Sequence, residues 1–263
     1  MSFLEHLEEL RWHIVRSAVS VLVFAIGAFI LYKSIFKVVL LAPRNPDFIT
    51  NRLLCSWAEK MNAPDLCINI VPLPMQSLNL QGQFSVTIMV SLYIGLIIAF
   101  PYLVWELWRF ISPALYENER KYARGSVFSI SIMFFIGALF GYYIILPLTI
   151  HFFGNWRVSD DIPTIVDLKS YFSFAYIPFA TGIIFELPVL MIFLTKVGIV
   201  TPDFMIKYRR HAIIVLMMVA AVITPPDIFS MTLVVLPLLL LYEISILLTK
   251  RTYKKYQQNM TNN

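Results

Sequence analysis

Residues 100–124 read FPYLVWELWRFISPALYENERKYAR, and this stretch decides how the chain is organised. It joins two long apolar segments through a short connector, residues 109–124, that carries four basic residues, two acids and several aromatic side chains. Short connectors rich in Lys and Arg stay on the cytoplasmic side of a membrane. The stretch therefore predicts a membrane protein with a docking surface on its cytoplasmic face rather than a buried catalytic pocket.

The composition agrees with a membrane protein. Hydrophobic residues make up 59% of the 263 residues and charged residues only 14%, and the mean hydropathy is +0.73. A soluble domain would be about a quarter charged. The net charge is +5, but the basic residues lie at the ends of apolar runs and not on one stripe. They indicate membrane topology, so we expect a lipid bilayer and no nucleic acid as a partner.

The apolar runs predict an all-α integral membrane protein, with one polytopic domain over residues 1–263 and six transmembrane helices in a kinked, concave bundle. A helix needs roughly 20 apolar residues to cross a bilayer. The predicted spans are about 14–32, 84–107, 125–153, 171–195, 212–224 and 228–248. The fifth is short, because a helix of that length reaches roughly 20 Å against a hydrocarbon core of about 30 Å. Kinks are predicted where prolines interrupt spans, at Pro147, Pro178, Pro188 and Pro237.

The distribution of Lys and Arg predicts the orientation. Of the 21 basic residues, 14 lie in the N-terminus, the loops 108–124 and 196–211, and the tail 249–263. The 33–83 loop has only five over its much greater length. By the positive-inside rule, both termini are cytoplasmic and 33–83 is external.

Two short segments have individual predictions. Residues 2–13 are expected to form a short helix on the inner membrane surface, with apolar side chains on one face and carboxylates on the other. After the fifth span, Pro225 and Pro226 predict a sharp turn because paired prolines cannot continue a helix. Asp227 would then cap the sixth helix.

Cys55 and Cys67 both lie in the external loop. In an oxidising compartment they could form a disulfide, although free thiols also fit the sequence. No His lies near either cysteine, so a metal site is not expected. The chain also lacks the P-loop, H-E-x-x-H and G-x-S-x-G signatures, so we predict neither an enzyme nor a cofactor.

Four motifs occur in order along almost the whole chain. They are Phe3-Leu4-Glu5-His6-Leu7-Glu8-Glu9-Leu10-Arg11, Phe110-Ile111-Ser112-Pro113-Ala114-Leu115-Tyr116 with Glu119-Arg120, Phe185-Glu186-Leu187-Pro188, and Thr224-Pro225-Pro226-Asp227-Ile228-Phe229-Ser230. Together they resemble the TatC family, the receptor subunit of the twin-arginine protein translocase. One departure is Met231, where many members of the family carry Gln.

The resemblance implies a six-helix protein of the bacterial cytoplasmic (inner) membrane. It would bind signal peptides that carry two consecutive arginines. It would work in an oligomeric complex with small single-span subunits of the TatA/TatB type. Folded proteins would then cross the membrane, driven by the proton gradient.

The predicted signal-peptide site combines carboxylates with an aromatic ring. Glu119 is the main candidate for bonding an arginine in a fork, although it could instead pair with Arg120 or Arg124. Phe110 would offer a π face to the cation, although it could be a membrane-interface anchor. The resemblance adds a second wall and the remaining members of the motif, which are Glu9, Arg11, Pro113 and Arg120.

Glu186 is an acidic residue in the interior of the fourth predicted span, where charged side chains are rare. A charged carboxylate there costs roughly 2.5–3.5 kcal/mol, so it must face the interior, be protonated or have a partner. The resemblance implies contact with the signal peptide or with a polar residue of a partner subunit. Alternatively, it is a protonated acid bonded to backbone loosened by Pro188. Glu106 and Glu243 are weaker examples of such an acid.

Two other functions fit part of the sequence. A secondary transporter of a small solute could use Glu186 as its coupling acid, since broken helices and buried acids suit such a protein. No internal repeat links the two halves of the chain, however. A non-transporting assembly scaffold is the third alternative.

Overall fold

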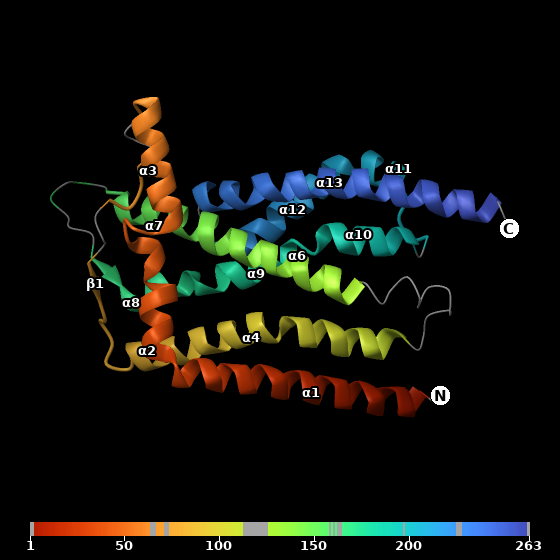
Figure 1. Ribbon diagram of the computed structural model, residues 1–263, viewed down its shortest axis with the longest axis horizontal. Coiled ribbons are helices and arrows are strands. Elements are labelled where there is room, and N and C mark those ends of the chain that lie inside the picture. Colours follow the sequence, from red (N-terminus) through yellow and green to blue (C-terminus); the bar gives the residue numbers. More distant parts are fainter. Residues whose placement is uncertain are drawn as a thin grey trace. The chain divides into compact units, whose positions relative to one another are not determined.

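The structure is a computed structural model of the chain, and it describes residues 3–63, 67–70, 74–112, 126–157, 159, 161, 165–196, 198–224 and 228–261 (Figure 1). Nearly all of these residues are helical. Within the described ranges, five helices are long and apolar enough to cross a membrane, namely Leu7–Ile30, Gly82–Ile111, Val127–Asn155, Leu168–Thr195 and Met231–Lys254. The prediction of an all-α membrane protein is confirmed. The concave form of the bundle and the cytoplasmic position of both termini stay predictions.

The chain divides into two compact units, and the first contains residues 1–132 and 138–179. Its main element is the antiparallel pair of α1 (Phe3–Ile30) and α4 (Gly82–Ile111), which lie side by side (Figure 1). The two helices approach closely at Gly95, where an added Cβ would lie 2.8 Å from the backbone nitrogen of Ala25. Small residues allow such close approach between membrane helices.

The N-terminal segment differs from its prediction. We expected a separate surface helix over residues 2–13, but α1 continues without a break from Phe3 into the first span. No Pro or Gly occurs before Gly27, so nothing in the local sequence interrupts the helix. The polar residues of the N-terminus therefore extend the same helix that enters the membrane.

The loop 33–83, predicted to be external, contains secondary structure of its own. In chain order its elements are α2 (Tyr32–Ile35), η1 (Phe36–Leu40), η2 (Ala42–Arg44), α3 (Ile49–Met61) and β1 (Met75–Gln76). Strand β1 pairs in parallel with β2 (Val166–Asp167), which comes from the connection between the third and fourth predicted spans. The two segments thus lie together at one end of this unit, as two loops on the same side of a membrane should.

The third span is interrupted near its middle. It consists of α6 (Ser126–Phe140), the π-helical segment η5 (Gly141–Ile145) and α7 (Leu146–Asn155). Pro147 stands in the first turn of α7. Because proline has no N–H to donate to the preceding turn, the hydrogen-bond pattern changes just before it.

The fourth span is also broken, into α8 (Leu168–Phe172), η6 (Ser173–Tyr176), α9 (Ile177–Ile184) and α10 (Leu187–Lys196). The break between α9 and α10 falls at Phe185 and Glu186, directly before Pro188. Pro188 cannot donate the bond to Ile184 that a continuous helix would require. The proline in the sequence therefore places Glu186 at a helix break.

The second unit contains residues 133–137 and 180–263. Here α6 crosses the fourth span at two glycines. A Cβ on Gly182 would lie 2.6 Å from the ring of the fully buried Phe134, and one on Gly137 would lie 2.6 Å from the Cβ of Phe185. Each glycine accommodates an aromatic residue from the other helix, and the crossing ends next to Glu186.

The remaining elements are α11 (Pro202–Lys207), α12 (Arg209–Ile223) and α13 (Ile228–Thr261). With 15 residues, α12 is roughly 22 Å long, so the fifth helix is short as predicted. The 34 residues of α13 continue without interruption through most of the predicted tail. The predicted turn residues Pro225, Pro226 and Asp227 lie outside the described residues.

Candidate functional site

The described part of the predicted signal-peptide site lies at the end of the α1–α4 pair that holds the N-terminus (Figure 1). Two contacts fix the register of this pair, Ala25 beside Gly95 and His13 beside Glu106. In that antiparallel register, Glu9 of α1 lies level with Phe110 of α4. The structure therefore brings these two predicted residues to the same end of one helix pair, with Glu9 only partly exposed.

Behind this end lies a buried polar cluster. The Nδ1–H of His13 donates a hydrogen bond to a carboxylate oxygen of Glu106, and their side chains are 6% and 1% exposed. The Nε of Arg16 is 3.6 Å from the same oxygen. The hydroxyl of Tyr102 donates to the other oxygen at 2.9 Å. Glu106 is thus a buried acid with partners on both helices.

The cluster also touches the aromatic residue of the predicted site. The ring of His13 meets that of Phe110 edge to face, with 5.8 Å between centroids. Arg109 directly precedes Phe110. Its guanidinium lies 5.8 Å from the ring of Trp105, one helical turn before it, which is a cation–π distance. Phe110 is half-buried. It is held from the side by His13, and His13 is held by Glu106.

The other predicted site residues divide into two groups. Arg11 is exposed on α1, and no described contact joins it to Phe110. Pro113, Glu119 and Arg120 lie outside the described residues, so their predicted roles stay predictions. The described site is therefore one wall, formed by Glu9 and Phe110 with the His13 cluster behind them.

Glu186 occupies the break between α9 and α10. Both of its carboxylate oxygens are buried and form no hydrogen bond with the residues that the structure describes. The backbone of Phe134 interacts with the carboxylate electrostatically, without the geometry of a hydrogen bond. A buried acid in this state can accept donors from another molecule, because its own surroundings leave its lone pairs unused.

Glu243 has a different environment. The guanidinium of Arg209, at the start of α12, donates to its carboxylate at 2.8 Å, and the two side chains are 47% and 48% exposed. Glu243 is therefore paired with a cation from the start of the fifth helix, and it lies near the middle of the candidate span Met231–Lys254. Of the three span acids, only Glu186 lacks a cationic partner among the described residues.

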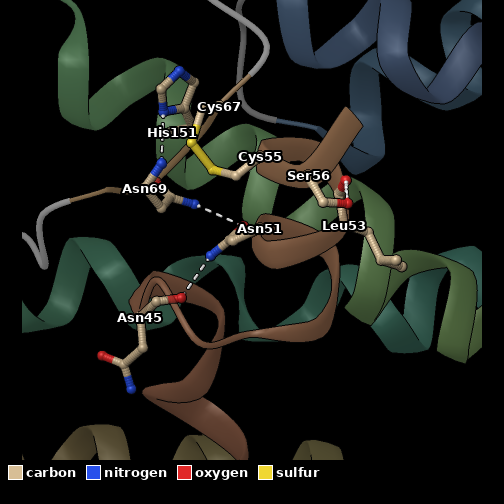
Figure 2. The surroundings of a disulfide bond; sticks show 8 residues. All are labelled: Asn45, Asn51, Leu53, Cys55, Ser56, Cys67, Asn69 and His151. Atoms are coloured by element: carbon tan, nitrogen blue, oxygen red, sulfur yellow. Dashed lines mark hydrogen bonds between the residues drawn. A yellow bond between two sulfur atoms is a disulfide. The ribbon is translucent and has the colours of Figure 1, made fainter. Parts of the chain in front are cut away.

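The structure joins Cys55 of α3 to Cys67 by a disulfide (Figure 2). A buried amide network lies beside it. The Asn51 amide donates to the carbonyls of Pro43 and Asn45 at 3.0 and 2.8 Å, and that of Asn69 donates to the Asn51 side-chain oxygen at 3.3 Å. These bonds fix α3 against the neighbouring turns. In the described part of the chain, no group of three His, Cys, Asp or Glu side chains could hold a metal ion.

The sequence reasoning missed the His13 cluster. His13 is one of four histidines that are scattered along the chain, and the sequence marked Glu106 only as a weaker example of an acid within a span. The spacing of polar residues within two spans could nevertheless have indicated this cluster. His13 and Arg16 stand three residues apart in an apolar span, and Tyr102 and Glu106 stand four apart in another, so each pair shares a helix face. A cationic face on one span requires an acidic face on a neighbour.

Comparison with known proteins gives one consistent family. The family model for the Sec-independent protein translocase protein (TatC) matches residues 5–237. A protein of this name from Blattabacterium sp. subsp. Periplaneta americana is 36% identical over 97% of both chains. The TatCy protein of Bacillus subtilis is 37% identical, over 98% of this chain and 92% of its own.

Solved structures agree. The crystal structure described as the twin arginine translocase receptor TatC superposes with a TM-score of 0.73 at 32% identity. It covers 94% of this chain and 99% of that one. A second crystal structure of that receptor, in the detergent DDM, gives a TM-score of 0.74 at 30% identity.

Proposed function

The chain belongs to the TatC family of Sec-independent protein translocase proteins, and on this premise we propose that it is the signal-peptide receptor of a twin-arginine translocase. Members of the family are components of a protein translocase and not enzymes. The chain binds the Arg-Arg signal of folded precursors at its cytoplasmic face. With small single-span subunits of the TatA/TatB type, it supports their export, driven by the proton gradient.

One observation carries this proposal: the α1–α4 register that sets Glu9 level with Phe110. An arginine needs a carboxylate for charge-assisted hydrogen bonds and gains roughly 0.5–2 kcal/mol from an aromatic face. Glu9 and Phe110 supply both kinds of group from two different helices. Glu119, nine residues after Phe110, supplies a second carboxylate for the second arginine.

Glu186 serves a later step. Its unbonded carboxylate, at a helix break within the fourth span, is suited to accept a donor from the inserted signal peptide or from a polar side chain of a partner subunit. Initial recognition of the arginines does not require it. The same carboxylate would suit a solute transporter, but the family membership favours protein transport.

The location follows the distribution of basic residues. The chain is a multi-pass membrane protein, and we place it in the bacterial cytoplasmic membrane with both termini inside. The arginine-binding end of α1 and α4 then faces the cytoplasm, where precursors fold. The external loop with its disulfide faces the oxidising side.

Photocrosslinking tests the receptor proposal. A photoreactive residue replaces Phe110 in the full chain, and a radiolabelled precursor carries either Arg-Arg or Lys-Lys in its signal. We expect a strong crosslink with Arg-Arg and a weak one with Lys-Lys, because Lys cannot form the bidentate fork. Phe84 is the matched control, since it is an exposed phenylalanine at the opposite end of α4.

Three outcomes are informative when no proton gradient is applied. A crosslink at residue 110 that depends on Arg-Arg, with none at residue 84, supports the proposal. Equal crosslinks with Arg-Arg and Lys-Lys would show that the precursor touches α4 without its arginines being recognised. The absence of any crosslink in a correctly inserted protein would favour the transporter function.

A further inference from the structure

Helix α3 carries an apolar stripe that the family assignment does not explain. Ile49, Leu53, Trp57 and Met61 follow one another at intervals of four residues, so they line one face of the helix. Their exposed fractions are 50, 55, 59 and 66%. Large apolar side chains that remain exposed in a continuous row mark an interaction surface.

The stripe is held outward by the contacts on another face of α3. Ala58 and Asn51 are 3% and 0% exposed, and Cys55 on the same side is bonded to Cys67. Figure 2 shows Leu53 on the side of α3 that is turned away from Cys55. The disulfide and the Asn51 hydrogen bonds therefore prevent α3 from rotating to bury its apolar stripe against its own chain.

A third face of α3 is charged. Arg52, Glu59 and Lys60 are exposed. At 100° per residue, Arg52 and Glu59 lie between the stripe and the disulfide side, whereas Lys60 lies within the angular range of the stripe, near the C-terminal end of the helix. The helix thus has a face toward its own unit, an apolar face and a charged face. An amphipathic helix with Trp on its apolar side is typical of the membrane interface, and a Lys near its end can extend its ammonium group past the apolar surface into water.

The depth of α3 agrees with such a position. The hydroxyl of Thr50, at the start of the helix, donates a hydrogen bond to the carbonyl of Tyr143 in the third span. Phe48 stacks on the same tyrosine, with 5.4 Å between ring centroids. Tyr143 comes 17 residues after Ser126, where the described part of that span begins. The distance along the helix from Ser126 to Tyr143 is roughly 25 Å, and the hydrocarbon core is about 30 Å thick. The start of α3 therefore lies near the far boundary of the core.

The direction of α3 and the side chains around it also fit a position at the membrane interface. In Figure 1, α3 crosses the direction of α1 and α4 at one end of the unit, as a helix parallel to the membrane plane would. Apolar side chains are also exposed next to its attachment. Ile144 follows Tyr143 and is 41% exposed, and Val39, whose carbonyl accepts a bond from Tyr142, is 38% exposed. The stripe therefore begins beside apolar surface of the spans.

We propose that α3 lies in the outer boundary of the bilayer, with Ile49, Leu53, Trp57 and Met61 in contact with lipid acyl chains. A second copy of the chain fits the stripe less well. Four side chains offer on the order of a few hundred Å², whereas a stable protein interface needs roughly 800 Å² per partner. Lipid requires no such minimum area. This inference depends on insertion of the chain in a membrane and not on signal-peptide recognition.

Site-directed spin labelling of the full chain in liposomes tests the proposal. The chain has only two cysteines, and both are in the disulfide, so an introduced cysteine is the only free thiol. Labels at L53C and W57C probe the stripe, and labels at R52C and S56C probe exposed neighbours on the polar side. Collisions are measured with oxygen, which dissolves in lipid, and with a nickel chelate, which stays in water.

We expect the ratio of oxygen to nickel collisions to be several-fold higher at residues 53 and 57 than at 52 and 56. High nickel collision rates at all four sites would overturn the proposal, since α3 would then lie in water. Low rates with both probes at 53 and 57, together with dipolar broadening between labels, would also overturn it and indicate contact between two copies.

A second measurement uses the fluorescence of Trp57 and a substitution that should leave the fold almost unchanged. Lipids brominated on their acyl chains quench tryptophan fluorescence by contact, and Trp57→Phe keeps an apolar ring at the same place. We expect the native chain to lose more fluorescence to these lipids than the W57F variant does. Equal losses would show that Trp57 does not reach the acyl chains and would contradict the proposal.

Discussion

The imidazole of His13 on α1 and the carboxylate of Glu106 on α4 form a buried hydrogen-bonded pair at the proposed receptor end of the protein. They stand 93 residues apart in the sequence. Arg16 and Tyr102 add polar contacts, and the ring of Phe110 rests against His13. The pair therefore connects the stability of two spans to the position of the aromatic residue proposed to bind arginine.

Replacing Glu106 by Ala should destabilise the protein strongly. The substitution leaves His13 and Arg16 without their acid, and breaking a buried ion pair costs about 3–5 kcal/mol. Glu243→Ala is the matched control, because its pair with Arg209 is about half-exposed and not buried, so its loss should cost less than the loss of Glu106. Thermal unfolding in detergent compares the two variants. An equal loss of stability in both would show that the buried cluster contributes nothing special.

Gly95→Ala should weaken the packing of α1 on α4. The new methyl group would lie 2.8 Å from the backbone nitrogen of Ala25 and 2.9 Å from the carbonyl oxygen of Val21. Backbone atoms cannot move aside easily, so we expect a loss of about 1–3 kcal/mol. Gly27→Ala is the control, because nothing lies within 4 Å of its added Cβ. That variant should keep its stability or gain up to about 1 kcal/mol. A tolerated G95A would contradict the close approach.

Removal of the disulfide should loosen α3. Cys55 and Cys67 are 12 residues apart, and closing a loop of about this size contributes about 3 kcal/mol in the chain-entropy description. In the C55S/C67S double variant, trypsin should cut faster at Arg52 and Lys60, which are exposed on α3. Reductant should accelerate cleavage of the native chain to the same rate and leave the variant unaffected. An unchanged cleavage rate would mean that the asparagine network alone holds the helix.

Glu119→Gln should weaken binding of an Arg-Arg signal peptide while insertion and folding remain intact. Hydrogen bonds to a charged group contribute about 1.5–3 kcal/mol, which corresponds to about 10–100-fold in Kd. The control is Glu117→Gln, two residues earlier in the same connector. Similar losses in both variants would mean that two acids share the peptide. Unchanged binding in E119Q would show that Glu119 does not contact the signal peptide and would favour the alternative, a local pair with Arg120 or Arg124.

Glu186→Gln should leave folding and peptide binding unchanged but impair export. Both carboxylate oxygens lack a hydrogen bond among the described residues, so the change from acid to amide, which keeps the shape of the side chain, removes no internal hydrogen bond. Export of a folded precursor into membrane vesicles measures the later step, and crosslinking at residue 110 measures binding. Normal export by the variant would assign Glu186 a purely structural role.

Much of the fold was predictable because its determinants are local. A long apolar run predicts a span wherever it occurs, and Pro147 and Pro188 predict interruptions because each lacks an N–H. The 15 residues of α12 make a short helix for the same local reason. The N-terminal segment is the exception. Its charge pattern suggested a separate surface helix, but no residue before Gly27 breaks α1.

The membrane class, the long apolar runs and the four motifs of the family could be read from the sequence alone. Which polar groups meet became clear only in the folded chain. It joined His13 to Glu106 and Arg209 to Glu243, left Glu186 without an internal hydrogen bond, and turned the apolar stripe of α3 outward. The two kinds of information differ in the distance along the chain over which they act. Hydropathy and proline act on neighbouring residues, whereas a buried charge is stabilised by a partner on another helix, and sequence distance does not identify that partner.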